Sequence, residues 1–228
     1  PLADMSRARI DGAAISEDVE LSLKRLRVEQ LDLFYLHRDD PARPVESILE
    51  VLARLVAAGK IAAVGLSNWT GARLAAARRS GIVPIASNQV LGNVLSRHMA
   101  PPADPTVVRL DGDALRDAET TGSSLFLFSA QCGGYFSKRL VSADAGPAAY
   151  RTPEAIAAAA QVSRLAVELG VDPTNLAVGF LLGFSPNIFP MIGPHTLAQL
   201  RQSMVARELR LAPATRAGLE AISGFSDW

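Results

Sequence analysis

Short apolar runs alternate with longer amphipathic segments along most of the chain, and this alternation restricts its fold more than any other feature. Near-continuous apolar runs of this length are typical of strands in a parallel sheet that helices cover on both faces. The repeat of strand and helix predicts βαβ units and the α/β fold class. The predicted strands span 31–37, 62–67, 83–89, 124–130 and 188–193.

The segments between the runs carry apolar residues at helical spacing. Ser16 is expected to cap the first helix, Pro44 to stand near the start of the second and Gly59 to end it. The stretch 90–122 has no such period, so we expect a long irregular loop there, of the kind that covers or binds ligands. The predicted helices span 16–28, 44–60, 71–81, 152–170, 172–184 and 196–211.

Composition narrows the class of protein. With 228 residues, 49% of them hydrophobic, the whole chain 1–228 is expected to form one large domain. Its 23 basic and 23 acidic residues give no electrostatic basis for binding nucleic acid or an anionic membrane. Cys132 is the single cysteine and cannot form an internal disulfide, which fits the cytoplasm. No stretch is typical of a signal peptide or of the ~20 apolar residues that span a bilayer.

The number of strands leaves two architectures open. An open doubly wound sheet can be built from five strands. A (β/α)8 TIM barrel needs eight strands and about 250 residues. Periodicity alone does not choose between them.

Five motifs stand in order along the chain: SLKRLRVEQLDLFYLHRDD at 22–40, GKIAAVGLSNW at 59–69, IASNQ at 85–89, FSAQCGGYFS at 128–137 and MIGPHTLAQLRQSM at 191–204. They resemble segments of the aldo-keto reductase family, and short signatures such as LHRDDP and SNW resemble a bacterial branch of it. The resemblance implies a TIM barrel with a nicotinamide cofactor across the C-terminal ends of the strands. The five predicted strands would be the fourth to eighth, so the barrel would be incomplete.

The resemblance also implies an aspartate, a tyrosine proton donor and a lysine from the first three βα units. No Asp-x-x-x-x-Tyr pattern precedes LHRDD here, so we expect these residues to belong to a longer protein. Tyr35 lies two residues before His37 and therefore on the same face of the strand, but one layer deeper in the core. Two functions stay open: an NAD(P)H-dependent carbonyl oxidoreductase, and a catalytically inactive remnant or cofactor-binding module.

His37 is the predicted catalytic residue. It ends a predicted strand, where the side chains of a barrel reach the active-site mouth. The resemblance implies that it orients the substrate carbonyl and assists proton transfer, for which an imidazole that titrates near neutrality is suited. The alternative is a core histidine bonded to a backbone carbonyl.

The nicotinamide end of the cofactor site is predicted at the next strand ends. The resemblance implies that Ser67, Asn68 and Gln89 bind the carboxamide, which needs both donors and acceptors. Turn capping is the alternative. Phe128 stands where the family places an aromatic ring against the nicotinamide, or is a plain core residue. Trp69 either lines the substrate mouth or closes the core.

The phosphate end is predicted on two segments. A glycine-rich turn that begins with Ser129, Ala130 and Gln131 would follow the pyrophosphate closely, with Gly134 allowing the approach. A helix starting near Thr196 would present N–H groups to phosphate. In this segment Gly193, Pro194, His195 and Gln199 stand where the resemblance implies a lysine or arginine for NADP, and Arg201 lies nearby, so NADP(H) is predicted with NAD(H) also open. Its candidate residues are Ile192, Gly193, Pro194, His195, Gln199, Gln202 and Ser203.

The expected partners are few. A small carbonyl compound is the expected substrate, and no residue spacing predicts a metal site. An incomplete barrel exposes strand edges and an apolar face, so self-association through this open side is expected.

Overall fold

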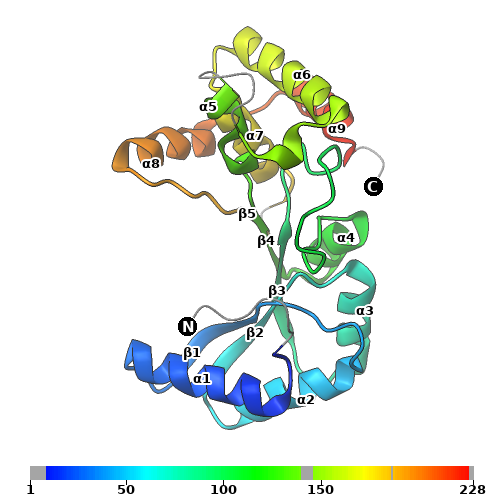
Figure 1. Ribbon diagram of the computed structural model, residues 1–228, viewed down its shortest axis with the longest axis vertical. Coiled ribbons are helices and arrows are strands. Elements are labelled where there is room, and N and C mark those ends of the chain that lie inside the picture. The colour runs from blue at the N-terminus through cyan, green and yellow to red at the C-terminus, as the bar shows by residue number, and fades with distance from the viewer. Residues whose placement is uncertain (1–8, 140–145, 186, 226–228) are drawn as a thin grey trace.

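All five predicted strands form one parallel sheet in the computed structural model, which describes residues 9–139, 146–185 and 187–225 (Figure 1). The spatial order follows the chain without reversal, and every neighbouring pair is parallel. A doubly wound sheet reverses its order at a switch point, so the observed order favours the barrel type. The strands are β1 (Leu31–Leu36), β2 (Ile61–Ser67), β3 (Ile85–Leu91), β4 (Ser124–Phe128) and β5 (Ile188–Pro190).

Each predicted helix is present, and three further helices appear. The helices are α1 (Gly12–Leu26), α2 (Val45–Ala57), α3 (Gly71–Ser80), α4 (Gly112–Thr121), α5 (Tyr135–Arg139), α6 (Pro153–Leu169), α7 (Pro173–Leu182), α8 (Leu197–Met204) and α9 (Pro213–Ser223). Short 3-10 turns lie at η1 (Cys132–Gly134), η2 (Ala148–Tyr150) and η3 (Val205–Glu208). The helices that were not predicted are α4, α5 and α9.

Two helix boundaries differ from the prediction. Helix α1 begins four residues before the expected cap, because the Asp11 carboxylate accepts a hydrogen bond from the Ala14 N–H at 2.8 Å. Ser16 lies inside the helix and donates to the Gly12 carbonyl. The stretch 90–122 was expected to be irregular, and this prediction is wrong where α4 forms. The Asp111 carboxylate caps α4 by accepting a hydrogen bond from the Ala114 N–H at 2.7 Å.

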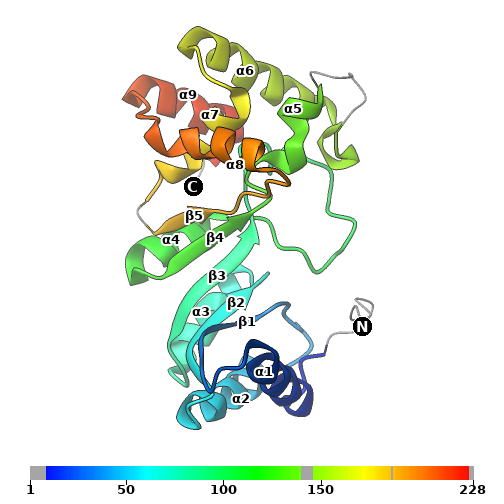
Figure 2. The same cartoon turned by 90° about the vertical axis from the view of Figure 1, so that its left-hand side faces the viewer.

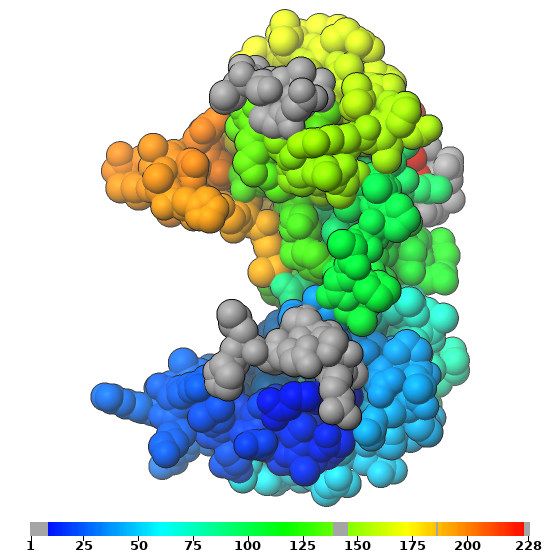
Figure 3. All heavy atoms as spheres, viewed as in Figure 1, coloured from blue at the N-terminus to red at the C-terminus, as the bar shows by residue number. Residues whose placement is uncertain are grey.

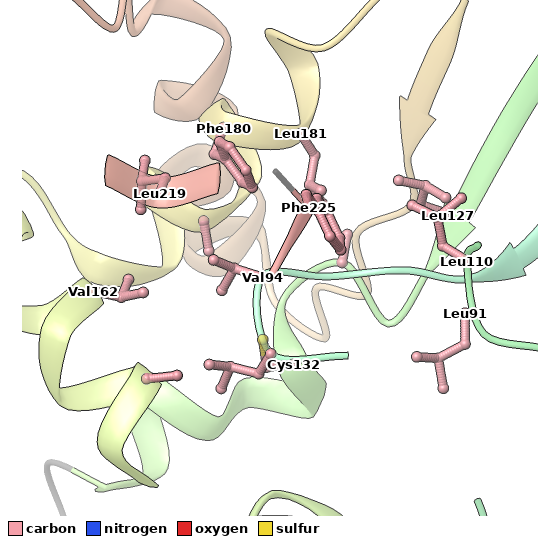
Figure 4. Packing of buried hydrophobic residues seen from close by; sticks show 14 of the residues in the cluster. Leu91, Val94, Leu110, Leu127, Cys132, Val162, Phe180, Leu181, Leu219 and Phe225 are labelled. Carbon is pink, nitrogen blue, oxygen red and sulfur yellow. The ribbon is translucent and has the colours of Figure 1, made fainter. Parts of the chain in front are cut away.

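Two apolar cores lie on the helical side of the sheet. The N-terminal core packs α1, α2 and α3 against the first strands, and the C-terminal core packs α4, α6, α7 and α9 against the last ones. Figure 1 shows α1 and α2 at one end of the molecule and α6, α7 and α9 at the other, with α3 and α4 side by side between them. In the C-terminal core, Phe180 stacks on Phe225 with 5.9 Å between ring centroids, close to Leu219 (Figure 4).

The other face of the sheet carries an open row of aromatic rings. Tyr35 meets the edge of Phe126 at 6.1 Å, and Phe126 stacks on Phe189 at 5.0 Å. Phe189 is 42% exposed and Leu33 is 39% exposed. Figure 3 shows the hollow on this side, between α8 and the N-terminal part of the molecule. In the described residues, neither β1 nor β5 has a strand on its outer edge.

The open face leads us to expect self-association of residues 1–228 expressed alone, because exposed strand edges and apolar side chains pair with further copies. Light scattering after gel filtration should find species larger than a monomer. Phe189→Lys should shift the protein toward the monomer, whereas Leu169→Lys, at an equally exposed position on α6, should not. A strictly monomeric wild-type chain would contradict the expectation.

Gly65 makes the packing of the open face possible. A Cβ atom there would lie 2.7 Å from the Tyr35 ring and 2.9 Å from the Ser87 hydroxyl. We expect Gly65→Ala to lower the free energy of unfolding by ~1–3 kcal/mol through overpacking. Gly218→Ala is the matched control, since no atom lies within 4 Å of its Cβ position in α9. Urea unfolding of the two variants checks this, and equal stabilities would refute it.

Candidate cofactor-binding and active site

The C-terminal ends of the first three strands bring four predicted residues together. Ser67 pairs with Gln89 in register, and its hydroxyl donates to the Gln89 carbonyl at 3.2 Å. The Asn68 N–H donates to the same carbonyl at 2.8 Å. The Asn68 amide in turn donates to the His37 carbonyl at 3.3 Å. These contacts hold the ends of β1, β2 and β3 together at one edge of the sheet.

Asn68 is fully engaged within the protein. It is 2% exposed and has a φ of 61°. Besides His37, its Nδ2 donates to the Ser67 hydroxyl at 3.0 Å, and its Oδ1 accepts from the Val108 N–H at 3.0 Å. These contacts match the turn-building alternative, and a carboxamide contact by Asn68 stays a prediction.

Of the amide side chains of Asn68 and Gln89, that of Gln89 has fewer strong hydrogen bonds within the protein. It is partly exposed, and its Oε1 accepts from the Ser67 hydroxyl at 3.3 Å. Its Nε2 faces only the sulfur of Met191, which is a weak acceptor. Of the three residues predicted for the carboxamide, Gln89 is the one whose donor is available to a ligand.

The His37 ring is exposed, and no hydrogen bond to it is present among the described residues. Partial burial and the Arg38 charge lower the pKa of His37, and Asp104 opposes this shift. The ring is therefore not the core histidine of the alternative interpretation. It is biased toward the neutral form, which has one donor and one acceptor nitrogen.

Tyr35 does not have the environment of a proton donor. Burial raises its pKa, and the hydrogen bond from the Ser87 hydroxyl at 2.7 Å only partly offsets this. A general acid at neutral pH needs a pKa near neutrality instead.

A cavity of about 540 Å³ lies beyond the ends of β4 and β5. It brings together most of the residues predicted for the phosphate end. Those that line it are Ser129, Gln131, Gly134, Ile192, Gly193, Pro194, His195, Gln199, Gln202 and Ser203. Residues 133 and 134, whose backbones have positive φ, form part of the same wall.

Gln131 joins the two walls of the cavity. Its Nε2 donates to the Ser203 hydroxyl at 2.8 Å, and its Oε1 accepts from the Gly193 N–H at 3.3 Å. The Gln199 side chain caps the start of α8. Its Oε1 accepts from the His195 N–H at 2.7 Å, and it forms a capping box with Thr196. The cofactor role predicted for Gln199 thus competes with a structural one.

Sequence reasoning missed five lining residues, namely Ser137, Lys138, Thr174, Asn175 and Met191. The Lys138 ammonium donates to the Gly133 carbonyl at 2.9 Å. Thr174 is 7% exposed, and its buried hydroxyl has no partner among the described residues. The Asp172 carboxylate caps α7 by accepting a hydrogen bond from the Thr174 N–H at 2.8 Å, and so holds the threonine at the wall.

Three predicted residues do not line the cavity and are buried or packed in a core. Trp69 is completely buried in the N-terminal core beneath the Arg73 guanidinium, 5.1 Å from its ring. Its burial favours the core-closing alternative over a substrate contact. Phe128 packs against the C-terminal core, and Ala130 is completely buried in it.

Two further searches concern metals and membranes. Within 9–139, 146–185 and 187–225, no group of three His, Cys, Asp or Glu side chains could hold a metal ion. In the same ranges no single helix is long and apolar enough to cross a membrane. The pair α6 and α7 passes that test only jointly and bends by 94°.

The chain is similar to several oxidoreductases. It is 27% identical over 201 residues to the uncharacterized oxidoreductase YrpG of Bacillus subtilis, covering 86% of this chain and 60% of that protein. It is 29% identical over 190 residues to the 6-dehydroglucose reductase of Agrobacterium fabrum, covering 82% and 55%. The chain thus spans about three-fifths of the length of these relatives.

The fold has close counterparts among solved structures. The crystal structure of the thermostable aldo-keto reductase Tm1743, in complex with the inhibitor epalrestat, matches with a TM-score of 0.70 at 21% identity. The match covers 93% of this chain and 67% of that one. The profile of the Aldo/keto reductase family matches residues 3–223. The chain belongs to the aldo/keto reductase family.

Proposed function

We propose that this chain forms the cofactor-binding part of an NAD(P)H-dependent carbonyl oxidoreductase, with β1 to β5 as the fourth to eighth strands of a TIM barrel. The observation that carries the proposal is the cavity between 129–138 and 191–203. Family membership supports oxidoreduction in general. No finding favours the alternative of an inactive module.

The cavity suits the diphosphate end of a dinucleotide. Lys138 supplies a positive charge, and the turn at Gly133 and Gly134 lets the backbone approach an anion closely. The unpartnered Thr174 hydroxyl can donate to a phosphate oxygen, which would remove the cost of leaving it unsatisfied. Gln89 is the candidate for the carboxamide at the other end.

The cofactor, when bound, supplies hydride chemistry, and the protein contributes position and hydrogen bonds. His37 would stand beside the carbonyl oxygen of the substrate, where its neutral ring can donate a hydrogen bond. The aspartate, tyrosine and lysine of the family's tetrad would come from preceding βα units. Substrate choice would depend on those units and on residues near His37.

The proposed site would discriminate only weakly between NADPH and NADH. Lys138 lies by the turn assigned to the diphosphate, which both cofactors share. The segment 192–203 contributes no lysine or arginine to the cavity wall, only His195 and neutral groups. A cytoplasmic location is also proposed, since the lone Cys132 cannot form an internal disulfide.

Calorimetric titration of NADPH and NADH tests the proposal. Lys138→Ala should weaken both cofactors by about tenfold, because a charge-assisted hydrogen bond contributes more than a neutral one. Thr174→Val should weaken both by a smaller factor. Lys24→Ala, on the distant helix α1, is the matched control and should bind like the wild type. Absence of binding to the wild type, or equal binding to Lys138→Ala, would refute the proposal.

A further inference from the structure

The segment 38–40, which follows His37, is tied to distant parts of the chain. Arg38 uses three of its nitrogen atoms: Nη1 donates to the His37 carbonyl at 3.0 Å, Nε to the Thr106 hydroxyl at 2.8 Å and Nη2 to the Asp104 carboxylate at 3.2 Å. Its side chain is only 18% exposed. A guanidinium held at three points is ordered, unlike that of a typical surface ion pair.

The loop that receives Arg38 runs from residue 92 to residue 110 and crosses between the two cores. Its first half is fastened to the C-terminal core, where the Ala100 N–H donates to the Ala149 carbonyl at 2.8 Å. Its second half reaches the strand ends, where the Val108 N–H donates to Asn68. Figure 2 shows the loop descending from the α6 side toward the N-terminal half.

Asp104 organises its own turn as well as the ion pair. Its Oδ1 accepts from the Thr106 N–H at 2.9 Å and from the Thr106 hydroxyl at 2.6 Å. Its Oδ2 faces Arg38. The turn 104–106 therefore presents a carboxylate and a hydroxyl together to one guanidinium.

We propose that Arg38 and Asp104 are positioning residues for His37, holding the loop 92–110 at the end of β1 and balancing the charge beside the imidazole. The catalytic meaning of this inference rests on the proposed function, but the contacts do not. The His37 carbonyl accepts hydrogen bonds from both Arg38 and Asn68, and both donors also contact the loop, so movement of the loop would be transmitted to His37.

The electrostatic part of the inference involves few groups. Arg38 favours the neutral imidazole, and Asp104 favours the charged one. The other carboxylates nearby have arginine partners of their own: Asp39 is bound at two points by Arg73 of α3, each at 2.7 Å, and Asp40 pairs with Arg43 at 3.3 Å.

Titration of His37 by NMR, without cofactor or substrate, tests the inference. The chain has three histidines, so His37→Ala identifies the signal. Asp104→Asn should lower the pKa of His37 by roughly 0.3–1 pH unit, because Arg38 is then unopposed. Arg38→Gln should raise it. The control is Asp117→Asn, which breaks another arginine pair, held at two points between α4 and α3, and should leave His37 unchanged.

Amide hydrogen exchange separates position from charge. Arg38→Lys keeps the charge but cannot make all three bonds, so Val108 should lose protection while the pKa of His37 changes little. Thr106→Val should loosen the loop in the same way without a change of charge. Equal effects of Asp104→Asn and Asp117→Asn on His37, or full protection of Val108 in Arg38→Lys, would overturn the inference. Since cofactor binding is measured separately, failure here leaves the proposed function intact.

Discussion

Residues 1–228 expressed alone should reduce reactive aldehydes at least about a hundredfold more slowly than a complete enzyme of the family. General acid catalysis typically contributes ~10²–10⁴-fold to such a rate. Within residues 1–228 neither candidate acid has a suitable environment: burial raises the pKa of Tyr35, and His37 is biased toward its neutral form. NADPH consumption followed by absorbance measures the rate.

The control for this assay is His37→Ala. Background turnover should be similar in the wild type and the variant, because orientation alone provides little acceleration without an acid. Robust turnover that disappears in His37→Ala would contradict the expectation. Tyr35→Phe would then show whether the tyrosine acts as the acid despite its environment.

Asn68→Ala should lower the free energy of unfolding by ~2–4 kcal/mol. The change leaves the partly buried Val108 N–H without its partner, removes one of the two donors to the His37 carbonyl and places alanine at a positive φ. Gln89→Ala is the matched comparison, since Gln89 is partly exposed and its Nε2 meets only a sulfur atom. It should cost little stability and weaken cofactor binding.

Denaturant unfolding and calorimetry together separate the two roles. The structure predicts that stability depends mainly on Asn68 and carboxamide binding mainly on Gln89. An Asn68→Ala variant that is as stable as the wild type but no longer binds cofactor would show that the hydrogen bonds of Asn68 are secondary to a ligand contact.

The strands were predictable because their signal is local. Each is a continuous apolar run, and a sheet covered by helices requires such runs whatever the details of packing. Helices α4 and α9 were missed because their apolar residues are few, and the capping contact of Asp111 becomes evident only in three dimensions. The start of α1 was misplaced because Ser16 and Asp11 both have the chemistry of a cap.

Site residues were predicted where a family-like motif falls at the end of a strand, as for His37 and Gln89. Residues whose role depends on partners far away in the sequence were not predicted. Lys138 and Thr174 reach the cavity from separate helices, and nothing in their neighbouring residues shows this. Asp39 is buried against Arg73, a contact over 34 residues of sequence that no local pattern indicates. Such long-range pairs follow from the fold and not from local pattern.

The central claim is that the cavity between 129–138 and 191–203 binds the adenosine diphosphate half of a nicotinamide cofactor. The most direct measurement is calorimetric titration of residues 1–228 with ADP-ribose and, separately, with nicotinamide mononucleotide. The account predicts that ADP-ribose binds with an affinity close to that of NADH, that Lys138→Ala weakens it by about tenfold, and that the mononucleotide binds far more weakly. Tighter binding of the mononucleotide, or binding of ADP-ribose that is indifferent to Lys138, would contradict it.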